Sequence, residues 1–280
     1  MDHPELTRGG YSIFHETMVD MTWLEIERAA RNGAVVLWGL GVVEEHGPHL
    51  PLGTDVYLPY ATLKLARRRL AERGVEALIA PPYYWGINNV TGSFPGSFTV
   101  RPDTMRALML DVFSSLRKDG FETIFCVSGQ GDALHNQTMA EAIRRGRAEI
   151  GVRAYFVVGS AWAERLGFAA DDAQFLIYPL APAPAPYADV HAGAGETSMT
   201  WGFFPDVVRG DVARTLRSTD LGPDDLSEWR RGWSNARRKT PLGYLGDPSA
   251  GDPERGRMLL ETQADLVAEA IVAKLASGSP

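Results

Sequence analysis

The chain has 280 residues, of which 28 are Lys or Arg and 35 are Asp or Glu, so its formal net charge is −7. With 45% hydrophobic and 22% charged residues, the composition is that of a globular protein and excludes disordered and fibrous classes. The acidic balance argues against a nucleic-acid partner, which requires a basic face, and against a polybasic membrane-surface protein. Because no long linker or internal repeat divides the chain, we interpret residues 1–280 as a single domain.

Cys126 is the single cysteine, so nothing in the sequence requires an oxidising compartment. Residues 1–5 have neither the basic start nor the apolar stretch of a signal peptide, and no apolar run is long enough to span a membrane. We therefore expect a cytoplasmic protein without a membrane partner. The alternating proline and alanine residues at 181–186 are expected to form a stiff surface loop.

Short apolar strands alternate with helical patterns along the chain. In chain order, the patterns predict a helix over 22–32, a strand over 34–38, a helix over 57–73, a strand over 76–80, a helix over 102–118, a strand over 123–127, a helix over 136–148, a strand over 152–158 and a helix over 256–275. Alternation of this kind is typical of βαβ units, so we expect an α/β fold with a parallel central sheet and helices on both faces.

Histidines and carboxylates gather in three predicted loop segments that together hold four of the six histidines. These segments are residues 39–55, 128–136 and 189–198. The first two directly follow predicted strands, and ligands of open α/β sheets bind beyond the carboxyl ends of strands. Mixed imidazole and carboxylate ligands suit Zn²⁺, Mn²⁺ or Fe²⁺. We expect Glu44 and His46, two apart in an extended loop, to point to opposite sides and serve two ions, with Asp55 between them. Taken singly, a histidine in such a loop is more often solvated or turn-stabilising than metal-bound, and it is the three clusters together that favour a metal site.

The sequence also resembles the creatininase (creatinine amidohydrolase) family. The resemblance is carried by residues 44–51 (EEHGPHLP), 54–55 (TD), 94–97 (FPGS), 191–193 (HAG), 196–198 (ETS) and 243–248 (GYLGDP). It extends from about residue 20 to 275. It implies a three-layer α/β/α sandwich with a mostly parallel central sheet, a homo-oligomer (a hexamer in the family), and a site for one or two ions of zinc, manganese or iron.

The resemblance further implies roles for individual residues. Glu44 binds one ion, His46 binds the other, and Asp55 bridges the two. His191 and Glu196 line the reaction centre, with His191 as proton donor or as stabiliser of the tetrahedral intermediate.

The middle motif departs from the family pattern. The family normally has a histidine ligand and, two residues on, a carboxylate ligand, where this chain has Gln130 and Asp132. A glutamine amide is a weaker zinc ligand than imidazole, so we expect one ion to be weakly held or absent unless His135 replaces the missing ligand. Alternatively, Gln130 only forms hydrogen bonds within the loop. Since His46, Asp55 and Asp132 are retained, we expect at least one ion to bind, with a catalytically degenerate binding protein as the alternative.

The loop after the second predicted strand is another departure, because many relatives carry a histidine near Thr91 and this chain has Asn88 and Asn89 instead. Their amides suit a neutral, hydroxyl-rich or amide substrate, although asparagine also tolerates left-handed turn positions. Trp85 and Ser93 complete the predicted substrate-binding set, with core packing as the alternative for the tryptophan.

Together these assignments predict a metal-dependent hydrolase. It would act on a small polar cyclic amide or related carbonyl compound through metal-activated water, with His191, Glu196 and Asp132 as catalytic groups. The chain has no serine-nucleophile elbow, phosphate-binding glycine loop or dinucleotide fingerprint. The alternatives are a hydrolase that opens a keto-inositol ring and a metal-dependent isomerase or lyase.

Overall fold

A computed structural model of the chain describes residues 12–180 and 187–278. The described residues form a five-stranded parallel sheet in the order β2-β1-β3-β4-β5. The strands are β1 (Val35–Leu40), β2 (Ala77–Ile79), β3 (Thr123–Ser128), β4 (Arg153–Gly159) and β5 (Phe175–Tyr178). The predicted α/β fold with a parallel sheet is confirmed. The segment at 181–186 and the first five residues lie outside the described ranges.

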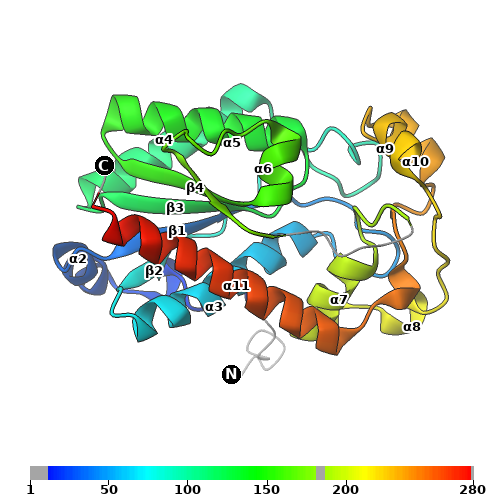
Figure 1. Cartoon of the computed structure of the whole chain (residues 1–280), viewed down its shortest axis with the longest axis horizontal. Coiled ribbons are helices and arrows are strands. Elements are labelled where there is room, and N and C mark those ends of the chain that lie inside the picture. The colour runs from blue at the N-terminus through cyan, green and yellow to red at the C-terminus, as the bar shows by residue number, and fades with distance from the viewer. Residues whose placement is uncertain (1–11, 181–186, 279–280) are drawn as a thin grey trace, which may run out of the picture.

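Helices cover both faces of this sheet (Figure 1). The helices and short helical turns are η1 (Met18–Asp20), α2 (Trp23–Arg31), α3 (Thr54–Glu72), α4 (Pro102–Lys118), α5 (Ala133–Arg145), η2 (Gly146–Ile150), α6 (Ser160–Leu166), α7 (Ala194–Phe203), η3 (Pro205–Val207), α8 (Gly210–Ala213), α9 (Pro223–Trp229), α10 (Ser234–Lys239), η4 (Pro248–Ala250) and α11 (Pro253–Ala276). Among the described residues, no helix is both long and apolar enough to span a bilayer.

The alternation of side chains along each strand divides the core into two layers. In β1, Val36 and Trp38 pack with residues of α4 and α5, whereas Val35 and Leu37 pack with residues of α3 and α11. All six residues of β1 are buried, as expected for a central parallel strand covered on both faces. The core therefore fixes the carboxyl end of β1 between two helical layers.

Most predicted elements are confirmed, but three helices begin three residues earlier than their apolar periodicity indicates, among them the helix predicted over 256–275, which begins at Pro253. The helix predicted over 57–73 begins at Thr54, and the helix predicted over 136–148 begins at Ala133. Polar first turns lack the apolar repeat on which the prediction rests. Asp55 and His135 therefore belong to first helical turns, although both were predicted to lie in loops. The short strand β5 and helix α7 were not predicted at all.

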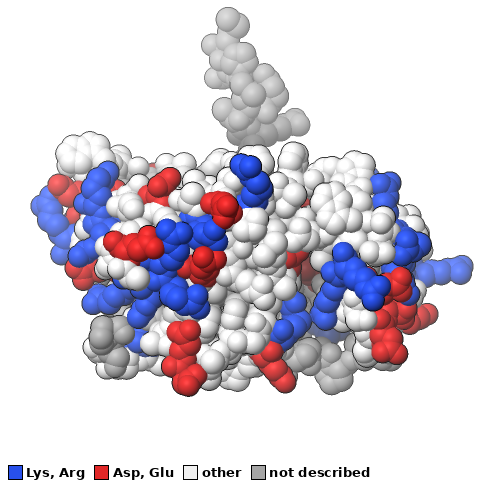
Figure 2. Space-filling view, turned by 90° about the horizontal axis from the view of Figure 1, so that it is seen from above, with Lys and Arg blue, Asp and Glu red and all other residues white. Residues whose placement is uncertain are grey.

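Charged side chains of both signs are interspersed at the two ends of the face shown in Figure 2, and uncharged side chains occupy much of its middle. Many of the arginines in the described chain are paired with carboxylates. Arg145 Nε, for example, lies 2.7 Å from Glu149 Oε1. Exposed pairs of this kind contribute little to stability, about 0–1 kcal/mol each. An arginine of the described chain that has no carboxylate partner differs from these paired ones.

Candidate metal centre

The strand order places the candidate site at a topological switch point. β1 and β3 are neighbours in the sheet, and the chain leaves their carboxyl ends toward helices on different faces of it. The segment after β1 carries Glu44 and His46, and Asp55 follows in the first turn of α3. An isolated bridge between His191 and Leu245 holds a segment from much later in the chain.

Two overlapping groups of side chains at this point are able to hold a metal ion. One ligand atom from each of Glu44, His46 and His191 lies within 4.8 Å of the others, and the same is true of His46, Asp55 and Glu196. The prediction that Glu44 and His46 point to opposite sides was wrong, because their ligand atoms converge. Side chains two residues apart in an extended segment lie on the same side of it, so the premise of the prediction was mistaken.

Hydrogen bonds orient His46 for a metal. Its Nδ1 lies 3.1 Å from the backbone oxygen of Glu44, which only accepts, so Nδ1 carries the proton. In the neutral ring Nε2 is then free to bind a cation, and it lies 3.1 Å from Asp55 Oδ1. Asp55 Oδ2 is buried without a hydrogen-bond partner among the described residues. Because a buried unpaired carboxylate oxygen is costly, this donor set fits a bound cation.

His191 is held in the complementary orientation. Its Nε2 donates to the backbone oxygen of Glu45 at 2.8 Å and lies 3.2 Å from Glu45 Oε1, so Nδ1 faces the Glu44 carboxylate, 4.0 Å away. Burial and the charge of His46 lower the pKa of His191, but the hydrogen bond and charge of Glu45 outweigh them and raise it to about 9. No role was predicted for Glu45, although this residue lies within the first motif, residues 44–51.

Burial raises the pKa of two carboxyl groups of the site, those of Glu44 and Glu196. Burial raises the pKa of Glu44 to about 8, and the charge of Asp55 adds to the effect. Burial also raises the pKa of Glu196, whose Oε2 accepts a hydrogen bond from Ala192 N at 2.6 Å. A metal ion that binds these groups must therefore displace protons.

Gln130 forms hydrogen bonds within the site, as its alternative interpretation predicted. Its Nε2 donates to Glu44 Oε1 at 3.1 Å, and its Oε1 accepts from Asp132 N at 2.9 Å. The Thr91 hydroxyl donates to the other Glu44 oxygen at 2.5 Å. Gln130 and Thr91 thus position the Glu44 carboxylate, and the amide oxygen that was expected to bind a metal is engaged by the backbone.

Asp132, expected as a ligand and catalytic group, caps α5 and belongs to neither metal-ligand group. Its Oδ1 accepts from Leu134 N at 2.8 Å, and its Oδ2 accepts from Asn89 N at 2.8 Å. His135 also does not replace a ligand in this arrangement. Its Nδ1 accepts from Ile87 N at 3.1 Å, so Nε2 carries the proton and has no lone pair for a cation.

The capping role of Asp132 is testable. We expect Asp132→Ala to lower the free energy of unfolding by about 1–2 kcal/mol, because it removes an N-cap and the link to Asn89. Asp132→Asn keeps an oxygen acceptor and should lose less than half of that. Urea denaturation measures both effects. If Asp132→Asn abolishes metal uptake while unfolding like the unaltered protein, a ligand role is established instead.

A cavity of about 610 Å³ opens beside the ligand groups and is lined by residues of several loops and of α5, α6, α7 and α9. Asn88 and Asn89 line it, and neither has a positive φ, so the left-handed-turn alternative is excluded. The Asn88 amide bonds to Thr91 on both of its polar atoms, which leaves the Asn89 side chain as the better candidate for substrate contact. Trp85 and Ser93 do not line this cavity.

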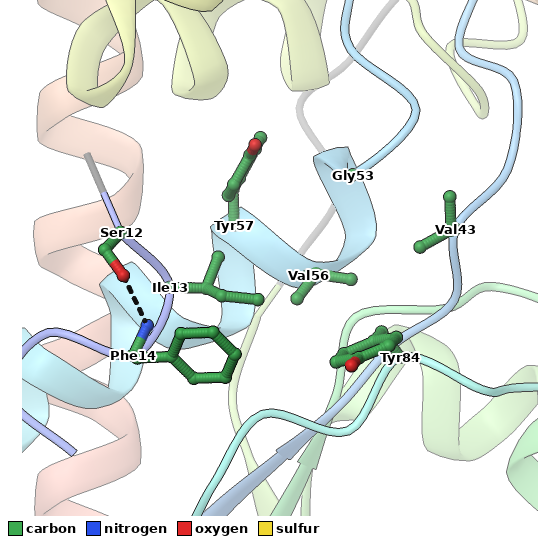
Figure 3. A pocket seen from close by; sticks show the side chains of 8 residues that line it. All are labelled: Ser12, Ile13, Phe14, Val43, Gly53, Val56, Tyr57 and Tyr84. Carbon is green, nitrogen blue, oxygen red and sulfur yellow. Dashed lines mark hydrogen bonds between the residues drawn. The ribbon is translucent and has the colours of Figure 1, made fainter. Parts of the chain in front are cut away.

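A second pocket, of about 470 Å³, is apolar and lies against the same two segments (Figure 3). Val43 and Val56 line it, next in the chain to Glu44 and Asp55. Tyr84 lines it as well, and its ring packs against exposed Trp85 with centroids 5.1 Å apart. Neighbouring residues of these two segments therefore line both pockets.

Comparison with known proteins identifies the family of this chain. The family model for creatinine amidohydrolase matches residues 19–271. The mycofactocin precursor peptide peptidase of Mycobacterium ulcerans is 28% identical over 234 residues, which cover 82% of this chain and 81% of that protein. The creatinine amidohydrolase of Pseudomonas putida is 28% identical over 263 residues, 90% of this chain and 94% of that protein.

The same fold occurs in solved creatininase structures. A crystal structure of creatininase superposes with a TM-score of 0.69 at 21% identity and covers 91% of this chain and 96% of that one. A manganese form and a zinc–zinc variant superpose with TM-scores of 0.68 and 0.66. The family match extends over most of the chain, including the converging ligand groups. The chain therefore belongs to the creatininase family of metal-dependent amidohydrolases.

Proposed function

We propose that this protein hydrolyses a small polar cyclic amide or a related carbonyl compound, with one or two zinc or manganese ions as cofactor; iron(II) suits the same ligands. The observation that carries the proposal is the convergence of two histidines and three carboxylates beside a cavity. The convergent residues are Glu44, His46, Asp55, His191 and Glu196. Relatives named for creatinine and peptide hydrolysis support an amide as the bond that is cleaved.

We assign these residues distinct roles. His46 Nε2 and Asp55 would hold an ion together with Glu196, whose Oε2 lies 3.7 Å from His46 Nε2, and Glu44 would bind an ion in the overlapping group that also contains His46. A bound ion of this kind lowers the pKa of a water molecule and polarises a carbonyl group. His191 holds a proton at Nδ1 when charged and donates it to the leaving nitrogen or to the developing oxyanion.

Peptide hydrolysis is a second candidate, because the cavity is larger than a single small ring requires and a relative is a peptide peptidase. A screen of the metal-loaded protein against cyclic amides, short peptides and a keto-inositol separates the candidates. Incorporation of ¹⁸O from labelled water into the product identifies hydrolysis and excludes isomerisation. If the metal-loaded protein hydrolyses none of these compounds, the degenerate binding protein is the better interpretation.

Metal affinity is expected to rise with pH. Since the pKa of Glu44 is raised to about 8, this ligand is protonated at pH 6 in the metal-free protein and loses its proton as the pH rises toward 8. Deprotonation through this range leaves fewer protons to displace, so we expect at least about tenfold tighter zinc binding at pH 8 than at pH 6. Calorimetric titration of chelator-treated protein measures this. Equal affinity at both pH values would contradict proton displacement.

We further propose a single-domain cytoplasmic homo-oligomer, hexameric as the resemblance implies. Three exposed apolar side chains support a subunit interface: Leu52, Trp85 and Phe98. The Trp85 and Phe98 rings are in contact, with centroids 6.0 Å apart. Light scattering on purified protein gives the assembly mass directly.

A further inference from the structure

Two arginines line the cavity beside the metal-ligand groups. Arg165 lies in α6, and Arg230 directly follows α9. The ring of Trp229 lies 5.8 Å from the ring of His191, so the chain neighbour of Arg230 packs against the metal centre. Residues from two elements about 65 positions apart thus bring positive charge to one cavity.

These guanidinium groups lack the carboxylate partners that other arginines have. Within the described chain, neither forms an ion pair, and the Arg230 side chain forms no hydrogen bond. Arg165 Nη2 donates only to the backbone oxygen of Gly131 at 2.9 Å, and its guanidinium lies 5.7 Å from the Trp162 ring. By contrast, Arg69 and Arg145 each lie 2.7 Å from a carboxylate oxygen.

The two positive charges are also close enough to repel each other. Both side chains keep exposed surface, and their partial burial lowers the pKa of both groups. The charge of Arg230 lowers the pKa of Arg165 further, whereas the charge of Asp132 raises it. An anion between them would relieve this repulsion and supply the missing acceptors. Guanidinium groups bind carboxylate and phosphate through two parallel hydrogen bonds, a geometry that the backbone oxygen of Gly131 does not satisfy.

The acidic residues nearest to this part of the cavity are otherwise engaged. Asp132 caps α5 and holds Asn89, as described above. Asp189 accepts hydrogen bonds from the backbone of Ala194 at 2.8 Å and of Gly195 at 2.9 Å. The charge of Asp132 acts on Arg165, but among the described residues neither carboxylate forms an ion pair with Arg165 or Arg230, so both guanidinium groups are available to an anionic ligand.

We propose that Arg165 and Arg230 form an anion subsite that holds a carboxylate or phosphate group of the substrate while its amide lies at the metal centre. This inference rests on the proposed function and adds that the substrate is anionic. A cavity of about 610 Å³ has room for a ring at the ligand groups and an acidic arm reaching the arginines. Neutral creatinine-sized rings would leave the subsite unused.

Matched ligands test the subsite in the zinc-loaded protein. The probes are hydantoins that carry an acetate, propionate or butyrate arm at ring position 5, each compared with its carboxamide and its phosphonate analogue. Binding is measured by calorimetry. For at least one arm length, we expect the acid to bind about tenfold or more tightly than the carboxamide, the range of a charge-assisted hydrogen bond. The better of carboxylate and phosphonate identifies the anion.

Variants then assign this preference to residues. The Arg165→Gln/Arg230→Gln protein should bind acid and carboxamide within about twofold of each other, and Arg230→Lys should keep part of the preference because it keeps the charge. Arg231→Gln is the matched control, because Arg231 is exposed and does not line the cavity. It should keep the full preference.

The outcomes separate the subsite from the reaction. Absence of any acid preference or of any acid binding in the unaltered protein overturns the subsite. A preference that survives in the double variant overturns it as well, because the acid is then bound at the metal. Ring opening is followed separately by chromatography of the product. An arginine-dependent preference without ring opening contradicts hydrolysis of this ring class alone, whereas ring opening without a preference contradicts the subsite alone.

Discussion

Replacing His46 with alanine is expected to remove most of the bound metal and to lower hydrolytic activity by on the order of 10³-fold. Mutation of a residue that only hydrogen-bonds to a metal ligand already lowers metal affinity or activity by about 10- to 100-fold, and loss of a ligand itself should have a larger effect. His46 is the one residue that both ligand groups share. Its Nε2 is free only because the Glu44 carbonyl fixes the proton on Nδ1. Loss of this side chain therefore weakens both groups together. Metal per chain, measured by plasma mass spectrometry on protein purified without a histidine tag, gives the result independently of any substrate.

His15→Ala is the matched control for this variant. His15 is exposed, belongs to neither metal-ligand group, and among residues 12–180 and 187–278 its ring pairs only with Asp20, at 3.4 Å. We expect its metal content and activity to equal those of the unaltered protein. Retention of full metal content by His46→Ala would contradict the ligand assignment. Gln130→His is a useful companion, because an increase in bound metal would show that Gln130 occupies a former ligand position.

Replacing Gly129 with alanine is expected to destabilise the protein and to displace Asp55. A Cβ atom at Gly129 would lie 2.1 Å from the backbone oxygen of Asp55 and 2.7 Å from Pro59 Cγ. The first of these contacts is with backbone, which cannot rotate away, so the first turn of α3 must move. Overpacking of this kind costs about 1–3 kcal/mol or more of unfolding free energy. Movement of the turn also withdraws a carboxylate from the metal site.

Gly131→Ala provides the control from the same loop. A Cβ atom there meets no atom within 4 Å, so we expect unfolding and metal uptake close to those of the unaltered protein. Urea denaturation of the metal-free proteins separates the steric effect from metal binding, and zinc titration then reports the position of Asp55. Gly41→Ala should reproduce the Gly129→Ala result, because its Cβ would lie 2.2 Å from the same oxygen. Normal unfolding of both variants would show that the first turn of α3 is free to shift.

The candidate site was predictable as far as its residues form compact motifs. Glu44, His46, Asp55, His191 and Glu196 were all singled out from the sequence, and the structure brings these five together. The roles of individual carboxylates were harder to predict from the sequence. Whether a carboxylate binds a metal or caps a helix depends on where the nearest backbone N–H groups lie, and this separates Asp55 from Asp132.

Arg165 and Arg230 carried no signal in the sequence. They lie on elements about 65 residues apart and belong to no recognisable spacing. They are notable because neither has a carboxylate partner among the described residues. This can be seen only once the neighbours of both side chains are known. The partners of Thr91 and Gln130 were also visible only in the structure, because both residues position Glu44 through hydrogen bonds that span 47 and 86 residues.

The sequence by itself determined the alternation of strands and helices, the parallel sheet and the two histidine-carboxylate motifs. Apolar periodicity and motif spacing are local properties, so they are readable along the chain. The tertiary structure alone decided that His191 and Glu196 join Glu44, His46 and Asp55, that Asp132 caps a helix and that two unpaired arginines line the same cavity. These features depend on long-range packing at the β1–β3 edge, where backbone carbonyl and N–H groups fix which atoms of each side chain remain free.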